Sequence, residues 1–572
     1  MKTTYKYLLL AGLVVLAASC EKEIEKESPA DATTGKMITE TISAQIEGET
    51  KATVDADAKF AWSLGDNIAV HVTKGDSHLY VDTVSGASEE AASASFSVSY
   101  GEGFSRDAFA IFPSTIVAGN AANYGQSGSP LDVTLPASYS LSTVTGEKTR
   151  CPMIASNTSS SWTFSQLCGL LRLTVNSIPS DATGLIIQFP GKKVNGTFSI
   201  AYPVTPGSST IVTDTPASGE DQITVTFAAG TTSATINLPL PTGDYDDVFI
   251  TPVGSSTKVA AVRHINAGGY TAQAAHGKKL TTTMVSFSMA ADKKVVFAPG
   301  NLQYIGSAAT PYWKFANNQY DYFGTTTAQE SDAANVDRDL FGWGTSGWNN
   351  TSADATWIYY QPWSTSYATG VDVNNGTGYG PSYALSDKDI TDSNANGDWG
   401  IYNDIKNANG SVKLYDKGTW KTPTKDYWYY IYVTRTCSST GIPDVPNACW
   451  IKGTIAGQAG MILFPDNYAH PGDASVTYSK SAFNKGNYSY TYFVVDAENW
   501  SKMEAAGAVF LPAAGYRNTG NLDRVGERGF YWSSTTKDKD DAWRSSYNAD
   551  NNDPNASNWR YHGYSVRLIR EL

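Results

Sequence analysis

Residues 41–72 read TISAQIEGETKATVDADAKFAWSLGDNIAVHV, and this segment begins and ends with a short run rich in β-branched residues. Gly, Pro, Asp and Ser separate these runs, and short spacing of this sort predicts strands that pair across one core, as in β-sandwiches. No persuasive helical period occurs before residue 287. Further runs of the same kind are LRLTVNSI (171–178), GLIIQF (184–189), QITVTF (222–227), ATINLPL (234–240) and DVFITPV (247–253).

The opening segment resembles the start of fimbrillin-like proteins, in which a strand and a Lys-Ala or Arg-Ala step precede W-x-x-GD-x-I-x-V. The resemblance implies two tandem transthyretin-like β-sandwiches, which we expect over residues 41–160 and 161–286. Many members are pilus subunits or anchors, in which a partner's strand fills a sheet edge exposed by removal of an N-terminal strand. Similar motifs are CPMIAS (151–156), FSQLCGLLRLTV (164–175), LPLPTGDY (238–245) and HGKKL (276–280).

Strand release is the point at which this chain departs from the family. Assembling fimbrillins are cleaved after an arginine, whereas the first arginine here is Arg106. Lys51 stands at the matching step and is the candidate cleavage site. The alternative, which we prefer, is that Lys51 is a solvated loop residue.

The N-terminus predicts an exported lipoprotein. A positively charged start and an apolar run over residues 8–18 predict a signal peptide over residues 1–19. Small residues precede Cys20 and resemble the lipobox of bacterial lipoproteins, which implies that Cys20 is acylated; the alternative is an incidental cysteine after an ordinary signal peptide. The acidic run EKEIEKE (21–27) predicts a solvated tether over residues 20–40. It also resembles the export signal of Bacteroidota-type surface lipoproteins, which implies a lipid-anchored protein exposed on the outer membrane.

The composition changes near residue 287. Of the 15 tryptophans, only Trp62 and Trp162 lie before this point, and Tyr, Asn and Asp become frequent after it. A shift of this kind predicts a domain boundary, so we expect a separate domain over residues 287–572. The pattern offers little reason for a core shared across the boundary.

Two helices are predicted in this second half. TPTKDYWYYIYVTR (422–435) reads as a short helix capped by Thr424. In DAENWSKMEAAG (496–507), Asp496 is the expected cap and Gly507 the expected end, with Trp500 and Met503 on one face. The predicted strands are KKVVF (293–297), AVFLP (508–512), RGFYWSST (528–535), AWRSSYN (542–548) and YSVRLIREL (564–572).

The second half resembles the Fibrobacter-type major paralogous domain over nearly its whole length. That family is similar to C-type-lectin folds, which implies a small twisted sheet, two helices and long irregular loops. The chain is therefore expected to be mainly β, with an α+β C-type-lectin-like domain last. Landmarks of the resemblance are VVFAPGNLQY (295–304), NQYDYFG (318–324), DLFGWGTSGWNN (339–350), GMILFPDN (460–467), GAVFLPAAGYR (507–517) and GYSVRLIR (563–570).

Catalytic motifs are missing from the sequence. It contains no HExxH, no GxSxG and no phosphate loop. The histidines are scattered, and His562 reads as a strand-edge residue rather than a ligand. Formylglycine-generating enzymes use a close reactive cysteine pair, which the spacing of Cys437 and Cys449 does not match. We therefore predict no enzymatic activity.

One segment resembles the first half of a calcium loop. DSNANG (392–397) places Asp392, Asn394 and Asn396 at alternate positions before a glycine, as in loops whose oxygens converge on calcium. The alternative is an Asn/Gly turn, because the twelfth position is Asn403 rather than glutamate. No other cofactor is predicted.

Four tryptophans are the candidate ligand contacts. They fall in a polar stretch, where exposed rings would stack on sugars or anchor a protein interface. Landmark positions such as Trp343 fit a core role better. The candidates are Trp343, Trp348, Trp357 and Trp363.

The remaining four cysteines lie in an exported chain, where disulfides persist. Cys437 and Cys449 flank the short segment SSTGIPDVPNA, and closing that loop would stabilise the protein by roughly 3 kcal/mol. For Cys151 and Cys168 we prefer free thiols that behave as small hydrophobic groups.

The net charge of −13 argues against nucleic-acid binding, which needs cations to neutralise phosphate. The sequence therefore predicts a surface lipoprotein that acts as an adhesin or a tip-like pilus-associated protein, with a lectin-like head on a fimbrillin-like base. Its expected partners are the outer membrane, fimbrillin subunits, and a glycan or a surface protein of host or bacterial cells. The alternatives are a glycan-capturing lipoprotein of a nutrient-uptake system and an enzyme of the formylglycine-generating-like fold.

Overall fold

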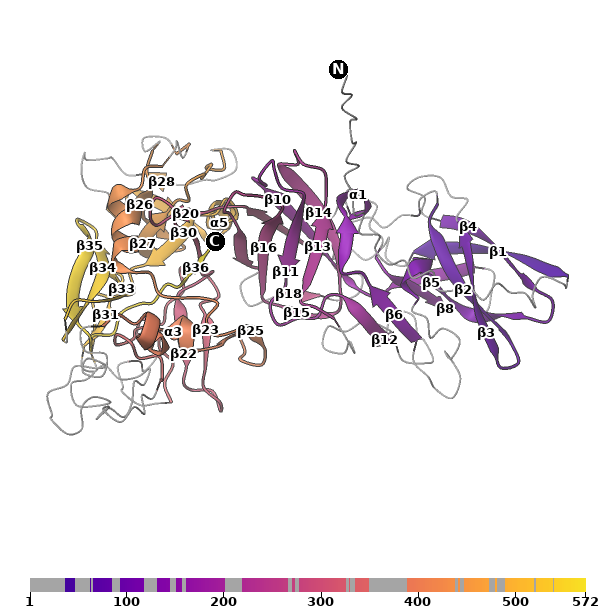
Figure 1. Cartoon of the computed structure of the whole chain (residues 1–572), viewed down its shortest axis with the longest axis horizontal. Helices are drawn as coiled ribbons and strands as arrows, with labels where there is room; N and C mark the ends of the chain where they lie inside the picture. The colour runs from indigo at the N-terminus through magenta and orange to yellow at the C-terminus, as the bar shows by residue number, and fades with distance from the viewer. Residues whose placement is uncertain are drawn as a thin grey trace, which may run out of the picture.

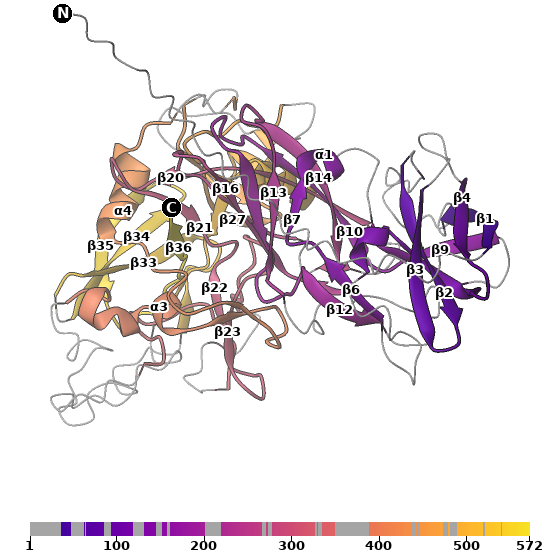
Figure 2. The same ribbon diagram turned by 45° about the vertical axis from the view of Figure 1, so that its right-hand side comes forward.

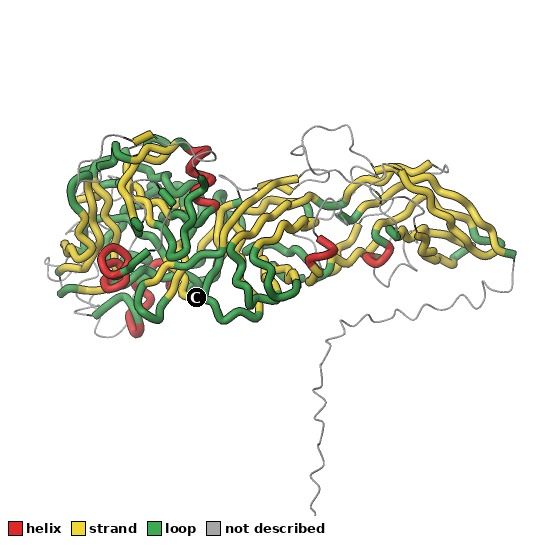
Figure 3. The backbone as a smooth tube through the Cα atoms, turned by 90° about the horizontal axis from the view of Figure 1, so that it is seen from above, coloured by secondary structure: helices red, strands yellow, loops and turns green. Residues whose placement is uncertain are grey.

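A computed structural model of the chain shows three parts in a row, with the first described strand at one end and the C-terminal part at the other (Figure 1). Strands dominate all three parts, and the helices are few and short (Figure 3). The fold is therefore mainly β, as the sequence predicts. The described residues are 36–46, 62, 65–84, 93–117, 131–144, 151–156, 161–200, 219–265, 270–272, 277–325, 329, 335–348, 388–437, 441–442, 447–472, 479–480, 489–518, 521–538 and 540–572.

The first part is one curved sheet whose two edge strands, β3 and β4, contact each other. Alternate residues of its strands point to one side and form a single apolar cluster. In order across the sheet, the strands are β3 (Ser77–Val84), β2 (Asn67–Lys74), β5 (Ser105–Phe112), β8 (Met153–Ser156), β9 (Ser161–Gln166), β1 (Met37–Ile46) and β4 (Ser93–Gly101).

Trp62 lies at the centre of this cluster and is fully buried. Its ring meets those of Phe96, Phe112 and Phe164 edge-on, at centroid distances of 5.2, 5.4 and 5.2 Å. Edge-to-face contacts of this kind add to the apolar burial. The tryptophan of the W-x-x-GD motif is therefore the residue around which the sheet curves.

The expected boundary at residue 160 does not separate the first two parts cleanly. Strand β9 lies in the first sheet, although it follows that boundary. Conversely, β7 (Ser138–Ser140) pairs with β13 (Gln222–Thr226) of the second part. A further ladder joins β6 (Leu131–Leu135) to β12 (Gly196–Ile200) between the two parts (Figure 2). The chain thus crosses between the two parts more than once.

The second part is a sandwich of two sheets. Their facing sides share one cluster of apolar side chains, in which residues of β10 alternate between buried and half-buried. One sheet contains β14 (Ser233–Leu240), β10 (Gly169–Asn176) and β19 (Gly277–Thr283). The other contains β17 (Ala261–His264), β16 (Asp247–Val253), β11 (Gly184–Gln188), β13 and β7, and a small ladder joins β15 (Gly243–Tyr245) to β18 (Tyr270–Ala272).

The C-terminal part holds several small sheets around two large apolar clusters and a third, smaller one. Its three-stranded sheets are β20 (Phe287–Ser288), β21 (Lys294–Phe297) and β36 (Ile569–Glu571), and β33 (Arg528–Thr536), β34 (Asp541–Asn548) and β35 (Asn552–Trp559). The others are β22 (Leu302–Ile305), β23 (Tyr312–Phe315), β24 (Ile405–Lys406) and β25 (Lys413–Tyr415); β28 (Ser479–Lys480), β29 (Phe493–Val495), β26 (Trp450–Ile455), β27 (Gln458–Leu463) and β30 (Val509–Pro512); and β31 (Tyr516–Asn518) with β32 (Asn521–Asp523).

The two helices predicted from capping residues are present. Thr424 Oγ1 accepts from Tyr427 N at the start of α4 (Lys425–Tyr429). Asp496 caps α5 (Ala497–Ala505), and Gly507 follows it with a φ of 95°. The remaining short helices are η1 (Ser114–Ile116), α1 (Leu141–Val144), η3 (Asp392–Gly397), α3 (Trp399–Tyr402) and the π-helix η4 (Tyr430–Thr434). Among the described residues, no helix is long and apolar enough to cross a membrane.

The second and C-terminal parts share a small core, contrary to the expectation of separate ones. Phe249 and Ala260 of the sandwich pack with Val296 of the C-terminal part in one buried cluster. The guanidinium of Arg570 lies 4.1 Å from the centre of the Phe249 ring. These contacts join the two parts, which the change in composition did not reveal.

Candidate functional site

Strand β1 lies inside the first sheet, between β4 and β9. It pairs antiparallel with β4 over Met37–Gln45 and parallel with β9 over Ser43–Ile46. Ile42 and Ala44 point into the core and are fully buried. Removal of this strand would leave backbone groups of both neighbours unpaired, which is an arrangement that accepts an added strand.

Glu40 lies on the same face of β1 as Ile42 and Ala44, at the edge of the core. It accepts from the hydroxyl of Tyr100 on β4 at 2.6 Å and pairs with Arg106 on β5 at 3.2 Å. Burial, together with the bond to Glu40, raises the pKa of Tyr100 to about 12. Because the Glu40 carboxylate is about one-third exposed, these contacts add little stability. The strand is held mainly by its ladders and by the apolar side chains of Ile38, Ile42, Ala44 and Ile46.

Two of the predicted sites in this region, Cys20 and Lys51, lie outside the described residues. Acylation of Cys20 and cleavage at Lys51 therefore stay predictions. Lys51 lies in the sequence between β1 and β2, the next described strand. Cleavage after Lys51 would therefore separate β1, and no other described strand, from the rest of the first sheet.

The C-terminal segment is buried on both faces. The sequence predicts that Tyr564, Val566 and Leu568 alternate with an outward face, and this is wrong, because no residue of Tyr564–Ile569 is more than 1% exposed. Only Ile569–Glu571 forms a regular strand, β36. The backbone of the rest forms hydrogen bonds with the backbone of other segments, at Phe341, Phe530, Trp532, Leu302 and Ala298.

Arg567 explains how a charged residue lies within this core. It is fully buried, and its guanidinium donates to Gln319 Oε1 at 2.5 Å and to Asn301 Oδ1 at 3.4 Å. Burial lowers the pKa of Arg567 to about 10. Pulling the segment out would break these bonds and leave Gln319 and Asn301 buried without this donor.

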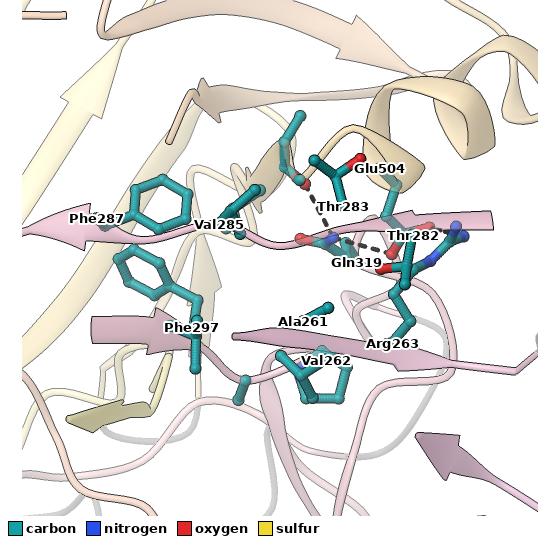
Figure 4. A pocket seen from close by; sticks show the side chains of 16 residues that line it. Ala261, Val262, Arg263, Thr282, Thr283, Val285, Phe287, Phe297, Gln319 and Glu504 are labelled. Atoms are coloured by element: carbon teal, nitrogen blue, oxygen red, sulfur yellow. Dashed lines mark hydrogen bonds and ion pairs between the residues drawn. The ribbon is translucent and has the colours of Figure 1, made fainter. Parts of the chain in front are cut away.

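A polar network extends from there to the second part. Glu504 accepts from Gln319 Nε2 at 2.9 Å and pairs with Arg263 at 3.3 Å. Figure 4 shows Arg263 and Gln319 pointing toward Glu504. The cavity beside them measures about 30 Å³, which is room for ~two water molecules. This junction is therefore structural and too small for an organic ligand.

A second polar contact at the junction is formed by Asp247. Its carboxylate accepts from His264 Nδ1 at 2.5 Å and from the Tyr415 hydroxyl at 2.8 Å, and His264 Nε2 lies 2.8 Å from the Ala316 carbonyl oxygen. Burial lowers the pKa of His264, but the Asp247 charge and the hydrogen bonds outweigh it, so the net shift is upward. Through His264, this network links the second part to the C-terminal part.

Two of the four tryptophans predicted as ligand contacts, Trp343 and Trp348, lie in the described part of the chain. Trp343 is fully buried, its Nε1 donates to the Ser533 carbonyl oxygen at 2.8 Å, and Arg560 lies over its ring at 4.4 Å. Its role is in the core, so this candidate contact is wrong. Trp348 is partly buried against the same core, while Trp357 and Trp363 lie outside the described residues.

Trp559 is an exposed tryptophan of the C-terminal part that the sequence reasoning missed. It is 46% exposed and stacks on Tyr561 at 5.3 Å. His562 beside it is not at a strand edge, as predicted, but is buried in the turn that follows β35. Burial and the nearby Arg544 lower the pKa of His562 to about 4. The closely spaced aromatic residues of WRYHGY (559–564) are the sequence signal that could have identified this cluster.

The calcium candidate lies in helix η3 (Asp392–Gly397). Asn396 is exposed, and its carbonyl oxygen accepts from Ser346 Oγ at 2.6 Å. The side chains of Asp392 and Asn394 are outside the described part of the chain. Among the residues that are described, no group of three or more His, Cys, Asp or Glu side chains is placed to hold a metal.

The cysteines divide into one bonded pair and two thiols. The Sγ atoms of Cys437 and Cys449 lie 2.07 Å apart in a disulfide. Cys151 and Cys168 are free and fully buried, and burial raises the pKa of Cys151 to about 12. Both thiols are therefore protonated members of the apolar cluster between the first sheet and the β6–β12 ladder.

Comparison with known proteins gives one family match and several structural ones. A family described as a domain of unknown function, DUF8237, matches residues 494–569. No curated protein matches the sequence.

The structural matches include fimbrial proteins and putative cell adhesion proteins. They include the tip fimbrial protein Mfa3 from Porphyromonas gingivalis with a C-terminal truncation, at 12% identity and a TM-score of 0.18, covering 42% of this chain and 81% of that one. The fimbrial anchor protein Mfa2 from the same organism matches at 10% identity and a TM-score of 0.19, covering 37% and 78%. A fimbrial protein from Bacteroides ovatus matches at 10% identity and a TM-score of 0.19, covering 93% and 99%.

Proposed function

We propose that this protein is a lipid-anchored, surface-exposed adhesin that stays as a single copy on its lipid or occupies the tip of a pilus. In this proposal the first two parts are a fimbrillin-like base of transthyretin-like sandwiches, and the C-terminal part is a lectin-like head. The proposal assigns no reaction to the chain. Acylated Cys20 and the acidic tether would hold the base at the outer membrane.

The position of β1 supports the capacity to accept a strand. It is the first described strand, it lies between two others, and Ile42 and Ala44 are its fully buried core side chains, with Ile38 and Ile46 partly buried against the same cluster. Cleavage in the segment after it would cut it from the rest of the sheet. A partner's strand with apolar residues at alternate positions would then fit between β4 and β9.

The observation that carries the proposal is the burial of the C-terminal segment. A stalk subunit must also offer a strand to its neighbour. Here Val566, Arg567 and Leu568 are fully buried in the head, so the C-terminus is not free to leave. A subunit that accepts a strand but does not donate its C-terminal segment would either occupy the tip of a fibre or remain a single copy on its lipid. Both arrangements suit an adhesin.

The test combines location with assembly. Whole cells labelled with a fatty acid should yield a labelled, protease-accessible protein, and Cys20→Ala should remove the label. The purified protein is then treated mildly with trypsin and run on size-exclusion chromatography with and without fimbrillin subunits. Both proteins carry Lys59→Ala, because trypsin would otherwise cleave the same segment after Lys59. In that background the matched control is Lys51→Ala, which should retain β1.

Each outcome has a defined meaning. A monomer, or one added copy per fibre that requires Lys51, supports the proposal. Ladders of self-polymer would show that the C-terminal segment is donated after all. A Cys20→Ala protein that stays labelled on the membrane would refute the anchor.

A further inference from the structure

One face of the β22–β23 hairpin is polar and nevertheless buried. Gln303 lies opposite Lys314 in the register, and Ile305 lies opposite Tyr312. Alternation along the strands places these four side chains on one face. The opposite face supplies the core residues Leu302, Tyr304, Trp313 and Phe315.

A pocket lies over this polar face. Its volume is about 540 Å³, within the roughly 300–1,000 Å³ typical of sites for small organic ligands. The segment after β23 contributes Tyr320, Asp321 and Tyr322, the turn between β26 and β27 contributes Ala456, and the start of β27 contributes Gln458. The pocket is therefore built by segments from across the C-terminal part.

Lys314 is the least usual residue of the pocket. Its side chain is only 8% exposed, yet its Nζ makes a single hydrogen bond, to Asn317 Oδ1 at 2.7 Å. Among the described residues, no carboxylate lies within 4 Å of it. Burial lowers the pKa of Lys314, although Asp321, Asp246 and Asp337 act in the other direction. A buried cation in this state disfavours folding, which points to a role in binding.

Gln303 is a second buried polar residue on this face. It is 4% exposed, lines the pocket, and makes no side-chain hydrogen bond to any other described residue. An amide offers two donors and an acceptor. Gln303 and Lys314 together thus present donors and an acceptor to the same space.

The charge at the pocket is balanced. Asp321 lines it with Lys314, and its Oδ2 accepts from Asn318 N and Nδ2, both at 2.9 Å. One cation and one anion side by side favour a neutral ligand over a strongly charged one. The second carboxylate oxygen remains as an acceptor for a hydroxyl group.

Aromatic rings complete the lining. The Tyr312 hydroxyl donates to the Ala408 carbonyl oxygen at 2.9 Å, which fixes the orientation of its ring. Tyr320 and Tyr322 are half-buried on the adjoining wall. Tyrosines of this kind present an apolar face and a polar tip to one ligand.

We propose that this pocket binds a neutral sugar ring. The ammonium of Lys314 and the amide of Gln303 would donate to ring hydroxyls, Asp321 would accept from one, and a tyrosine ring would cover the C–H face. Binding would need no calcium, since every group named belongs to the protein. The inference rests on the proposed function, for which it supplies a ligand class for the head.

The test uses the whole chain and saturation-transfer NMR. The probes are methyl glycosides of glucose, galactose, mannose and N-acetylglucosamine, with glucuronic acid as the charged comparator. Calorimetry on any sugar that binds then compares Lys314→Met with Lys417→Met, an exposed lysine outside the pocket. We expect Lys314→Met to weaken binding by about tenfold or more, as the loss of a charged hydrogen bond would. Lys417→Met and added EDTA should change nothing.

A second variant guards against misfolding. Tyr320→Ala removes a half-buried ring that also packs against an apolar cluster, so its binding is measured well below its melting temperature, where it should be weakened several-fold. Binding of glucuronic acid alone, binding unchanged in Lys314→Met, or no binding of any sugar would each overturn the inference. None of these results would affect fatty-acid labelling or strand exchange, so failure here is distinct from failure of the adhesin proposal.

Discussion

Asp247 and His264 face each other on neighbouring strands, β16 and β17, with 2.5 Å between Asp247 Oδ1 and His264 Nδ1. His264 then bonds across the junction to the Ala316 carbonyl oxygen. Two residues 17 positions apart thereby help to fix the second part to the C-terminal part. Ionisation of His264 makes that junction sensitive to pH.

The first prediction concerns this histidine. Burial lowers the pKa of His264, but the Asp247 charge and the hydrogen bonds of His264 raise it by more than burial lowers it. The folded pKa therefore lies above the unfolded value of about 6.5. Its stabilising contribution is complete below pH 6.5 and is lost as pH rises through the folded pKa. The stability difference between wild type and His264→Gln, measured by denaturant unfolding, should therefore shrink as pH rises. A difference that grows with pH would contradict this assignment.

His562 should show the opposite dependence. Burial and Arg544 lower its pKa from 6.5 to about 4, so the unfolded state takes up a proton first as pH falls. Stability should drop between pH 6.5 and 4, by up to about 3 kcal/mol from this group. His562→Phe, which keeps an aromatic ring in the cluster, should flatten that part of the pH profile. An unchanged acid limb would show that other groups dominate it.

The C-terminal segment should tolerate little change. Leu568 is fully buried, so Leu568→Ala should destabilise the head by about 2–5 kcal/mol through lost burial and a residual cavity. The matched control is Val433→Ala, because Val433 is 54% exposed and should change stability by less than about 0.5 kcal/mol. Equal effects of the two variants in urea melts would argue against a locked C-terminus.

The disulfide should contribute through the short loop that it closes. Cys437 and Cys449 are 12 residues apart, which corresponds to about 3 kcal/mol in the chain-entropy model. The double variant Cys437→Ser, Cys449→Ser should unfold at correspondingly lower guanidinium concentration. Reductant should shift wild type toward the variant and leave the variant unchanged; a shift in both would implicate something else.

Lys314→Met should stabilise the protein. At neutral pH the folded state holds a buried ammonium whose pKa is lowered chiefly by burial, so removing the charge should add about 1 kcal/mol. A higher melting temperature together with lost sugar binding would show that stability is given up for binding at this site. A lower melting temperature would mean that the bond to Asn317 matters more than the buried charge.

The local elements were predictable because their causes lie within a few residues. The β-branched runs from residue 41 to residue 253 form strands, as their alternation indicates. Thr424 and Asp496 cap helices because a side-chain oxygen reaches an amide three residues on. These features depend on the nearest neighbours in the sequence and were therefore available without a structure.

Tertiary structure alone decided which surfaces are covered. Tyr564–Ile569 alternates in sequence as a half-exposed strand does, yet segments from residues 298 to 341 and from 531 cover both of its faces. Gln303 and Lys314 look like the solvent side of a hairpin, and contacts from as far as Gln458 turn that side into a pocket. Burial is a property of what packs against a residue, and here the packing partners lie tens to hundreds of positions away. The sequence by itself therefore determined the strands, the caps and the family resemblance, whereas only the tertiary structure decided the locked C-terminus, the shared junction and the pocket.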